Sequence, residues 1–203
     1  MYLLVDMVII THNIKIINSD ILKLNLKELI NSEFENFDKI NVCANLPYYI
    51  TSDIIMYILE NEEIKIDSLT LMLQKEAAER ICASPGTRNA GAISLAVRYY
   101  GTPEILFDVG RENFVPSPNV DSVVIRIDMT KSMKNFVKNK SNFFKLVRAA
   151  FSQRRKNILN SLSSQMGMPK ERISEILKSS NIDSSLRAEQ LSFEDFAKIS
   201  DNF

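Results

Sequence analysis

The residues best suited to chemistry in this chain are Asn45, Leu46, Pro47 and Tyr48, which follow one another directly. The apolar run before them, residues 39–44, predicts a buried strand, and open α/β sheets bind ligands at the carboxyl ends of strands. Pro47 fixes its own φ and disfavours helical geometry at Leu46, so the loop should be stiff. It can hold the Asn45 amide oxygen and a main-chain carbonyl as two acceptors, while Tyr48 offers a stacking face. This arrangement predicts methyl transfer to an exocyclic amine on a planar heterocycle.

Composition excludes several classes of protein. With 203 residues, 45% hydrophobic and 25% charged, the chain should form one sizeable globular domain and a small one. A single histidine, His12, argues against histidine-based or metal chemistry. Cys43 and Cys82 lack metal-type spacing and are expected to be reduced, buried thiols of a cytoplasmic protein. The apolar opening, residues 1–10, resembles neither a signal peptide nor a membrane span.

Charge is distributed unevenly, although the net charge is zero. Residues 1–130 contain 11 basic and 18 acidic side chains, whereas residues 131–190 contain 13 basic and 4 acidic ones. The split is compatible with a catalytic body joined to a module that meets a polyanion, and equally with a set of lysine-rich solvated helices.

Hydrophobic periodicity predicts strands alternating with helices, followed by helices alone. Such alternation implies a mostly parallel sheet with flanking helices. The boundary is expected near residues 129–142, which separates an α/β domain, 1–130, from a helical domain, 131–203. Strands are expected at 14–17, 39–44, 68–73, 105–109 and 122–127, and helices at 22–30, from 51, at 75–83, at 92–100 and from 142 onward.

The Asn-Leu-Pro-Tyr loop on its own would equally suit an ordinary strand-to-helix turn. Further segments of the sequence make its interpretation more specific. Together with that loop they resemble the small-subunit ribosomal RNA adenine dimethyltransferases (the KsgA family), from about Asn13 to the C-terminus. The matching segments, in chain order, are Gln74-Lys-Glu-Ala-Ala-Glu-Arg-Ile81 with Pro85-Gly86, Phe114-Val-Pro-Ser-Pro-Asn-Val-Asp-Ser122, Phe151-Ser-Gln-Arg-Arg-Lys-Asn-Ile-Leu-Asn-Ser161 and Arg187-Ala-Glu-Gln-Leu-Ser192.

The resemblance implies a Rossmann-like class I methyltransferase sheet followed by a small all-helical domain. It also implies S-adenosylmethionine as the methyl donor and ribosomal RNA of the small subunit as the partner of a monomeric, cytoplasmic enzyme. Asp20 would accept a hydrogen bond from the cofactor's adenine, although an aspartate there also suits a helix N-cap. Asn45 would lie between cofactor and substrate. Phe114 would form a second wall for the target base opposite Tyr48, or be an ordinary core phenylalanine.

A basic surface is expected on the helix that starts near residue 142. If one helix continued through Leu162, four basic residues would share an arc of about 100° at 3.6 residues per turn. These are Lys145, Arg148, Arg155 and Lys156. Arg154 adjoins them, and the set is expected to contact RNA phosphates.

One departure from the family concerns the cofactor. Its members hold S-adenosylmethionine over a glycine-rich turn after their first strand, but the five glycines of this chain form no G-x-G turn. The first two strands also lack a counterpart, unless residues 1–10 supply one. We therefore expect an N-terminally truncated or mis-started chain with little affinity for the cofactor. The rival readings are a non-catalytic RNA-binding or ribosome-assembly module and a macrolide-resistance type methylase of large-subunit ribosomal RNA.

Overall fold

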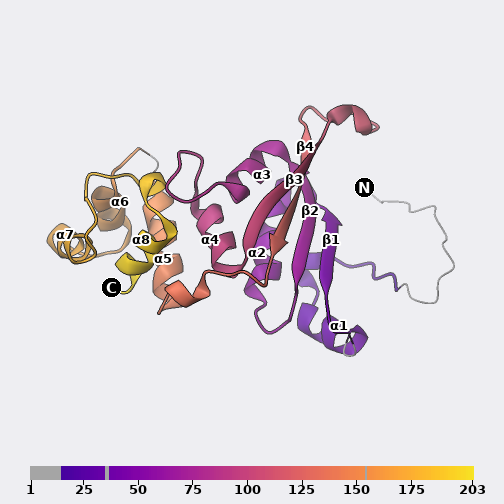
Figure 1. Cartoon of the computed structure of the whole chain (residues 1–203), viewed down its shortest axis with the longest axis horizontal. Coiled ribbons are helices and arrows are strands. Elements are labelled where there is room, and N and C mark those ends of the chain that lie inside the picture. The colour runs from indigo at the N-terminus through magenta and orange to yellow at the C-terminus, as the bar shows by residue number, and fades with distance from the viewer. Residues whose placement is uncertain (1–14, 35–36, 154) are drawn as a thin grey trace.

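The computed structural model describes residues 15–34, 37–153 and 155–203. The expected strand within residues 1–10 and the side chain of Arg154 lie outside this part of the chain. The described part forms an elongated molecule, with a sheet and its helices at one end and a group of helices at the other (Figure 1).

The sheet contains four described strands in the order β1-β2-β4-β3. They are β1 (Asn41–Asn45), β2 (Ser68–Gln74), β3 (Thr102–Val109) and β4 (Ser122–Asp128). β1 runs parallel to β2, but β4 runs antiparallel to both β2 and β3. The expectation of a mostly parallel sheet is therefore wrong for the described strands. A loop without a crossover helix joins β3 to β4, and adjacent strands so connected pair antiparallel.

The expected strand at 14–17 is also wrong as far as the structure describes it, because residues 15–17 are not in a strand. Ile16 and Ile17 are exposed, and β1 pairs with β2 alone among the described strands. An apolar run without a neighbouring strand has no ladder to join.

The exposure of Cys43 has the same cause, because β1 pairs on one side only among the described strands. On β1 the side chains of Asn41, Cys43 and Asn45 are all exposed, so Cys43 is a free thiol but not a buried one.

Helices α1 to α4 belong to the sheet end of the molecule. They are α1 (Leu26–Glu33), α2 (Thr51–Glu60), α3 (Lys75–Cys82) and α4 (Ala92–Tyr100). The last three lie where the periodicity predicts them. The helix expected at 22–30 is instead a 3-10 turn at Ile21–Lys23 followed by α1, because the Asn25 side chain accepts from Glu28 N at 3.1 Å and caps a new helix.

Four helices follow: α5 (Lys140–Phe151), α6 (Ile158–Gln165), α7 (Lys170–Ser179) and α8 (Phe193–Ser200). A single helix through Leu162 is therefore wrong. The chain leaves the helix after Phe151, and the Asn157 side chain starts α6 by accepting from Asn160 N at 2.9 Å. Among the described residues, no helix is long and apolar enough to cross a bilayer.

An aromatic cluster joins the two ends of the molecule. Tyr99 and Tyr100 of α4 pack against Phe143 and Phe144 of α5, with ring centroids 5.1–5.8 Å apart between the two helices, and the Phe193 ring centroid lies 5.0 Å from that of Phe143. These aromatic side chains belong to one contiguous hydrophobic core, which includes residues of both the sheet and the C-terminal helices. The domain boundary expected near residues 129–142 therefore separates two groups of elements that share one core.

A charged cluster covers this junction. Glu62, just after α2, forms ion pairs with Lys134 at 2.7 Å and with Lys140 at the start of α5. Although partial burial acts to raise it, these two ammonium groups hold the pKa of Glu62 below its ordinary value. Lys134 and Lys140 also lie 5.3 Å from the centroid of the Tyr100 ring. Cation–π contacts and ion pairs thus hold the linker and α5 against the sheet end.

Candidate adenine-binding site

The loop after β1 is anchored to the sheet. Pro47 has φ −60° and ψ 126°, so the chain stays extended there before a 3-10 turn at Tyr48–Ile50. Leu46, only 5% exposed, donates its backbone N–H to the Met72 carbonyl at 3.0 Å. The Pro47 carbonyl accepts from the Thr51 hydroxyl at 3.1 Å and from Ile50 N at 3.2 Å. These bonds give the loop the stiffness that the sequence predicts.

Two acceptors remain free at this point. Within the described part of the chain, no group donates to the Asn45 side chain or to the Leu46 carbonyl oxygen. Asn45 is exposed at the last position of β1. The Pro47 carbonyl is already occupied, whereas the Asn45 amide oxygen and the Leu46 carbonyl oxygen have no donor in the described structure.

Tyr48 is held by a residue far away in the sequence. Its phenolic oxygen lies 2.7 Å from the Ser122 hydroxyl, and Ser122 is fully buried as the first residue of β4. The bond joins the Asn-Leu-Pro-Tyr loop to the end of the Phe114–Ser122 segment. Sequence reasoning included Ser122 in a matching segment but assigned it no role, because nothing in its local pattern distinguishes a tether from a core serine.

Replacing Tyr48 by phenylalanine tests this tether. The buried Ser122 hydroxyl would lose its only partner in the described structure, so the free energy of unfolding should fall by about 1–3 kcal/mol. Adding Ser122→Ala should recover part of the loss, because no buried hydroxyl is then left unpaired. Urea unfolding measures both, and an unchanged midpoint for Tyr48→Phe would show that the bond is absent in solution.

Asp20 has the capping role that the sequence left open. Its carboxylate accepts from Leu22 N at 3.1 Å and starts the 3-10 turn, and its second oxygen lies 3.8 Å from Lys23 Nζ. A carboxylate oxygen has room for further hydrogen bonds. Contact between Asp20 and a cofactor therefore stays a prediction.

Phe114 is half-buried and directly follows a 3-10 turn at Arg111–Asn113. Its backbone N–H donates to the Arg111 carbonyl at 3.3 Å. The loop that carries it returns to the sheet at Asp121, whose carbonyl accepts from Lys75 N at 3.0 Å. These bonds fix the loop to the sheet edge, but a wall formed by Phe114 opposite Tyr48 remains a prediction.

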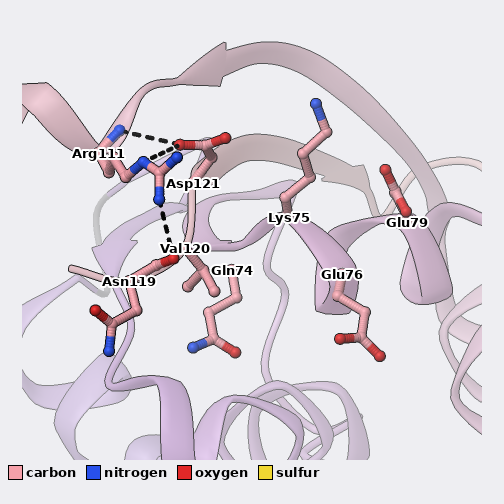
Figure 2. A pocket seen from close by; sticks show the side chains of 8 residues that line it. All are labelled: Gln74, Lys75, Glu76, Glu79, Arg111, Asn119, Val120 and Asp121. Atoms are coloured by element: carbon pink, nitrogen blue, oxygen red, sulfur yellow. Dashed lines mark hydrogen bonds and ion pairs between the residues drawn. The ribbon is translucent and has the colours of Figure 1, made fainter.

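Beside this edge lies a cavity of about 390 Å³ (Figure 2). Lys75 lies 3.1 Å from Asp108, and this hydrogen bond raises the pKa of Lys75. Arg111 contacts Asp121 at 3.8 Å and donates to the Asn119 carbonyl at 3.4 Å. Residues 74–81 and 114–122 are among the segments that match the family, but the sequence did not predict a cavity between them. Its walls come from Gln74, Lys75, Glu76, Glu79, Arg111, Asn119, Val120 and Asp121.

The basic residues do not form the expected arc. Lys145 and Arg148 are exposed on α5, whereas Arg155 and Lys156 are exposed in the segment between α5 and α6. The helix ends before the second pair, so the helical spacing that predicted one arc does not apply. Within the described residues, no group of three His, Cys, Asp or Glu side chains is placed to hold a metal ion.

Curated relatives match this chain over most of its length. The small-subunit ribosomal RNA methyltransferase A of Alkaliphilus oremlandii is 44% identical over 191 residues, covering 94% of this chain and 66% of the relative. That of Clostridioides difficile is 45% identical over 188 residues, covering 93% and 64%. The chain thus spans slightly less than two thirds of these curated relatives.

Solved structures show the same fold. A dimethyladenosine transferase from Plasmodium falciparum matches with a TM-score of 0.64 and 26% identity, over 79% of this chain and 65% of that one. The 23S rRNA methyltransferase ErmE matches with a TM-score of 0.63 at 20% identity, over 92% and 70%, which shows the fold alone. The fold is therefore Rossmann-like and of the methyltransferase type. The family model of ribosomal RNA adenine dimethylase matches residues 3–203, and the chain belongs to this family.

Proposed function

We propose that this chain carries the adenine-binding and RNA-contacting part of an S-adenosylmethionine-dependent dimethyltransferase that acts, as a monomer, on adenine amines of small-subunit ribosomal RNA. The observation that carries the proposal is the pair of free acceptors, on Asn45 and Leu46, beside a tyrosine whose hydroxyl is tethered. Relatives that are 44–45% identical are small-subunit ribosomal RNA methyltransferases, which supports the small subunit over the large one as the substrate.

The reaction needs an amine whose lone pair is available. Adenine's amine is a poor nucleophile because its lone pair is delocalised into the ring. Acceptors on Asn45 and Leu46 favour a pyramidal nitrogen, and so stabilise the transition state more than the ground state. Tyr48 would stack on the base after it leaves its own stack. No strong base is required, since the proton becomes acidic only after the methyl group has arrived. Holding nitrogen and methyl in line supplies much of the remaining rate.

The described residues fit the adenine end of the cofactor. Asp20 retains accepting capacity after capping its turn, and Asn45 is exposed at the end of β1. S-adenosylmethionine, when bound, supplies the methyl group. The sequence contains no G-x-G turn for its methionine end.

The 203-residue chain by itself is therefore expected to bind S-adenosylmethionine weakly, because its sequence offers no G-x-G turn to enclose the methionine end and small-molecule sites bury most of their ligand. Isothermal titration is the measurement, and adenosine is the matched probe for the adenine end. Micromolar binding at one site per chain would contradict the expectation and show that other residues complete the site. The rival function, an RNA-binding module without catalysis, is supported by the same observation, that the given sequence contains no G-x-G turn.

Whether the proposed activity exists can be tested in a protein that joins this chain to the third of the Alkaliphilus oremlandii relative that the match does not cover. The joined protein should transfer labelled methyl groups to small-subunit ribosomal RNA. Labelling of large-subunit RNA instead would support the macrolide-resistance type of methylase, and labelling of neither would overturn the proposal.

The basic segment between α5 and α6 should contact RNA phosphates. Replacing Arg155 and Lys156 by alanine should weaken RNA binding and reduce the slope of log affinity against log salt by roughly 0.7–0.9 per lost contact. Lys170→Ala with Lys178→Ala, two exposed lysines of α7, is the matched control and should leave the slope unchanged. Equal slopes for both double variants would mean that Arg155 and Lys156 are merely solvated.

A further inference from the structure

Two of the stretches that match the family, residues 74–81 and 114–122, have no role in the reaction described above apart from Ser122 and Phe114. Both contribute to the cavity of about 390 Å³, which has walls from the start of α3 and from the loop before β4. This volume falls within the range of roughly 300–1,000 Å³ that small-molecule sites occupy.

The cavity adjoins the tyrosine through the sheet. Gln74, the last residue of β2, is the ladder partner of Ser122, and the Ser122 hydroxyl lies 2.7 Å from the Tyr48 phenol. The neighbouring residue, Lys75, donates its backbone N–H to the Asp121 carbonyl at 3.0 Å. Tyr48 and the cavity are thus joined through Ser122 and Gln74, at the end of the sheet where β1 and β2 finish.

The charges of the cavity disfavour a phosphate. Its two cations are engaged, Lys75 with Asp108 and Arg111 with Asp121. Three carboxylates line the walls, of which only Glu76 has a basic partner on its own helix, Arg80 at 2.9 Å. An anion would meet more negative than positive charge there, so the cavity suits a neutral group with hydrogen-bonding edges.

Two side-chain amides are available to such a group. In the described structure no hydrogen bond engages the side chains of Gln74 and Asn119. In Figure 2, Val120 lies between them and Glu79 lies on the opposite side. Bonds from Arg111 to the backbone of Asn119 and to the Asp121 carboxylate hold this part of the loop in place. An amide offers a donor and an acceptor together, which is the pattern that base edges present.

We propose that this cavity binds the base of a nucleotide next to the target adenine, through the amides of Gln74 and Asn119. The proposal rests on the proposed function, since it takes the base on Tyr48 as its reference point. Gln74 and Asn119 would then select which base stands beside the target adenine. Proteins recognise single-stranded RNA through such hydrogen bonds to base edges.

The test uses the full chain and end-labelled fluorescent single-stranded RNA pentamers with one adenine, at the centre, and follows fluorescence anisotropy. The flanking positions carry either uracil or an abasic ribose, on the 5′ or the 3′ side. Removing the base that occupies the cavity should weaken binding about tenfold, as expected for one lost base contact. Gln74→Met and Asn119→Ala should weaken binding of the intact pentamer similarly and abolish its advantage over the abasic one.

Gln165→Met, on the exposed end of α6, is the control and should keep that advantage. Equal affinity of the intact pentamer and both abasic pentamers for the unaltered chain would overturn the cavity proposal. So would a full advantage in both cavity variants. If Tyr48→Ala still changes affinity in that case, the proposed function survives. Absence of binding by every pentamer, or no effect of Tyr48→Ala, would overturn the proposed function and the cavity with it.

Discussion

Replacing Asn45 by alanine should lower methyl transfer by roughly 10²- to 10³-fold in the joined protein, the usual cost of removing one group that stabilises a transition state. Asn45 and the Leu46 carbonyl are the two free acceptors at the end of β1, and the variant leaves one of them. The loss should appear mainly in kcat, because the acceptor acts on the reacting nitrogen rather than on the RNA backbone.

Asn89→Ala provides the control, since Asn89 is an exposed asparagine outside the site. It should retain normal turnover, and both variants should bind small-subunit RNA with near-normal affinity. Turnover within threefold of normal for Asn45→Ala would remove Asn45 from the mechanism. A loss of RNA affinity with unchanged kcat would instead make it a simple binding residue.

The largest expected effect on stability comes from Phe143→Ala. Phe143 is fully buried and contacts Tyr99, Phe144 and Phe193, so it belongs to both ends of the molecule. Truncating a buried phenylalanine costs about 3–5 kcal/mol, a large part of the stability of most domains. Urea unfolding followed by circular dichroism measures the loss.

Phe136→Ala is the matched control, because this ring lies in the same linker region but is 54% exposed. It should change the free energy of unfolding by about 0.5 kcal/mol or less. The shared core also predicts that the sheet end and the C-terminal helices unfold in one transition. Two separate transitions, with only the second shifted by Phe143→Ala, would show that the helices form an independent domain.

Local patterns in the sequence were sufficient for much of the fold. The expected elements at 68–73, 75–83, 92–100 and 122–127 appear with nearly the same bounds, because their apolar residues face one core at a regular period. The stiff loop after β1 also follows from its residues, since Pro47 restricts the backbone whatever surrounds it. Family membership was likewise evident, because five short segments occur in the right order.

Local patterns were insufficient wherever the outcome depends on distant partners. The apolar run at 14–17 resembles a strand, but residues 15–17 have no ladder to join. Apolar spacing continues past residue 151, yet the helix ends there and α6 starts at a new cap. The antiparallel direction of β4 depends on which strands it joins, which periodicity does not specify.

The sequence by itself therefore determined which residues could do chemistry, through types and short spacings that need no neighbours. Only the tertiary structure decided which of them act together. The bond between Tyr48 and Ser122 spans 74 residues, and the cavity between Gln74 and Asn119 exists because β2 pairs with β4. Contacts of this kind arise from burying one common core, and the free energy that selects them belongs to the whole chain rather than to any segment.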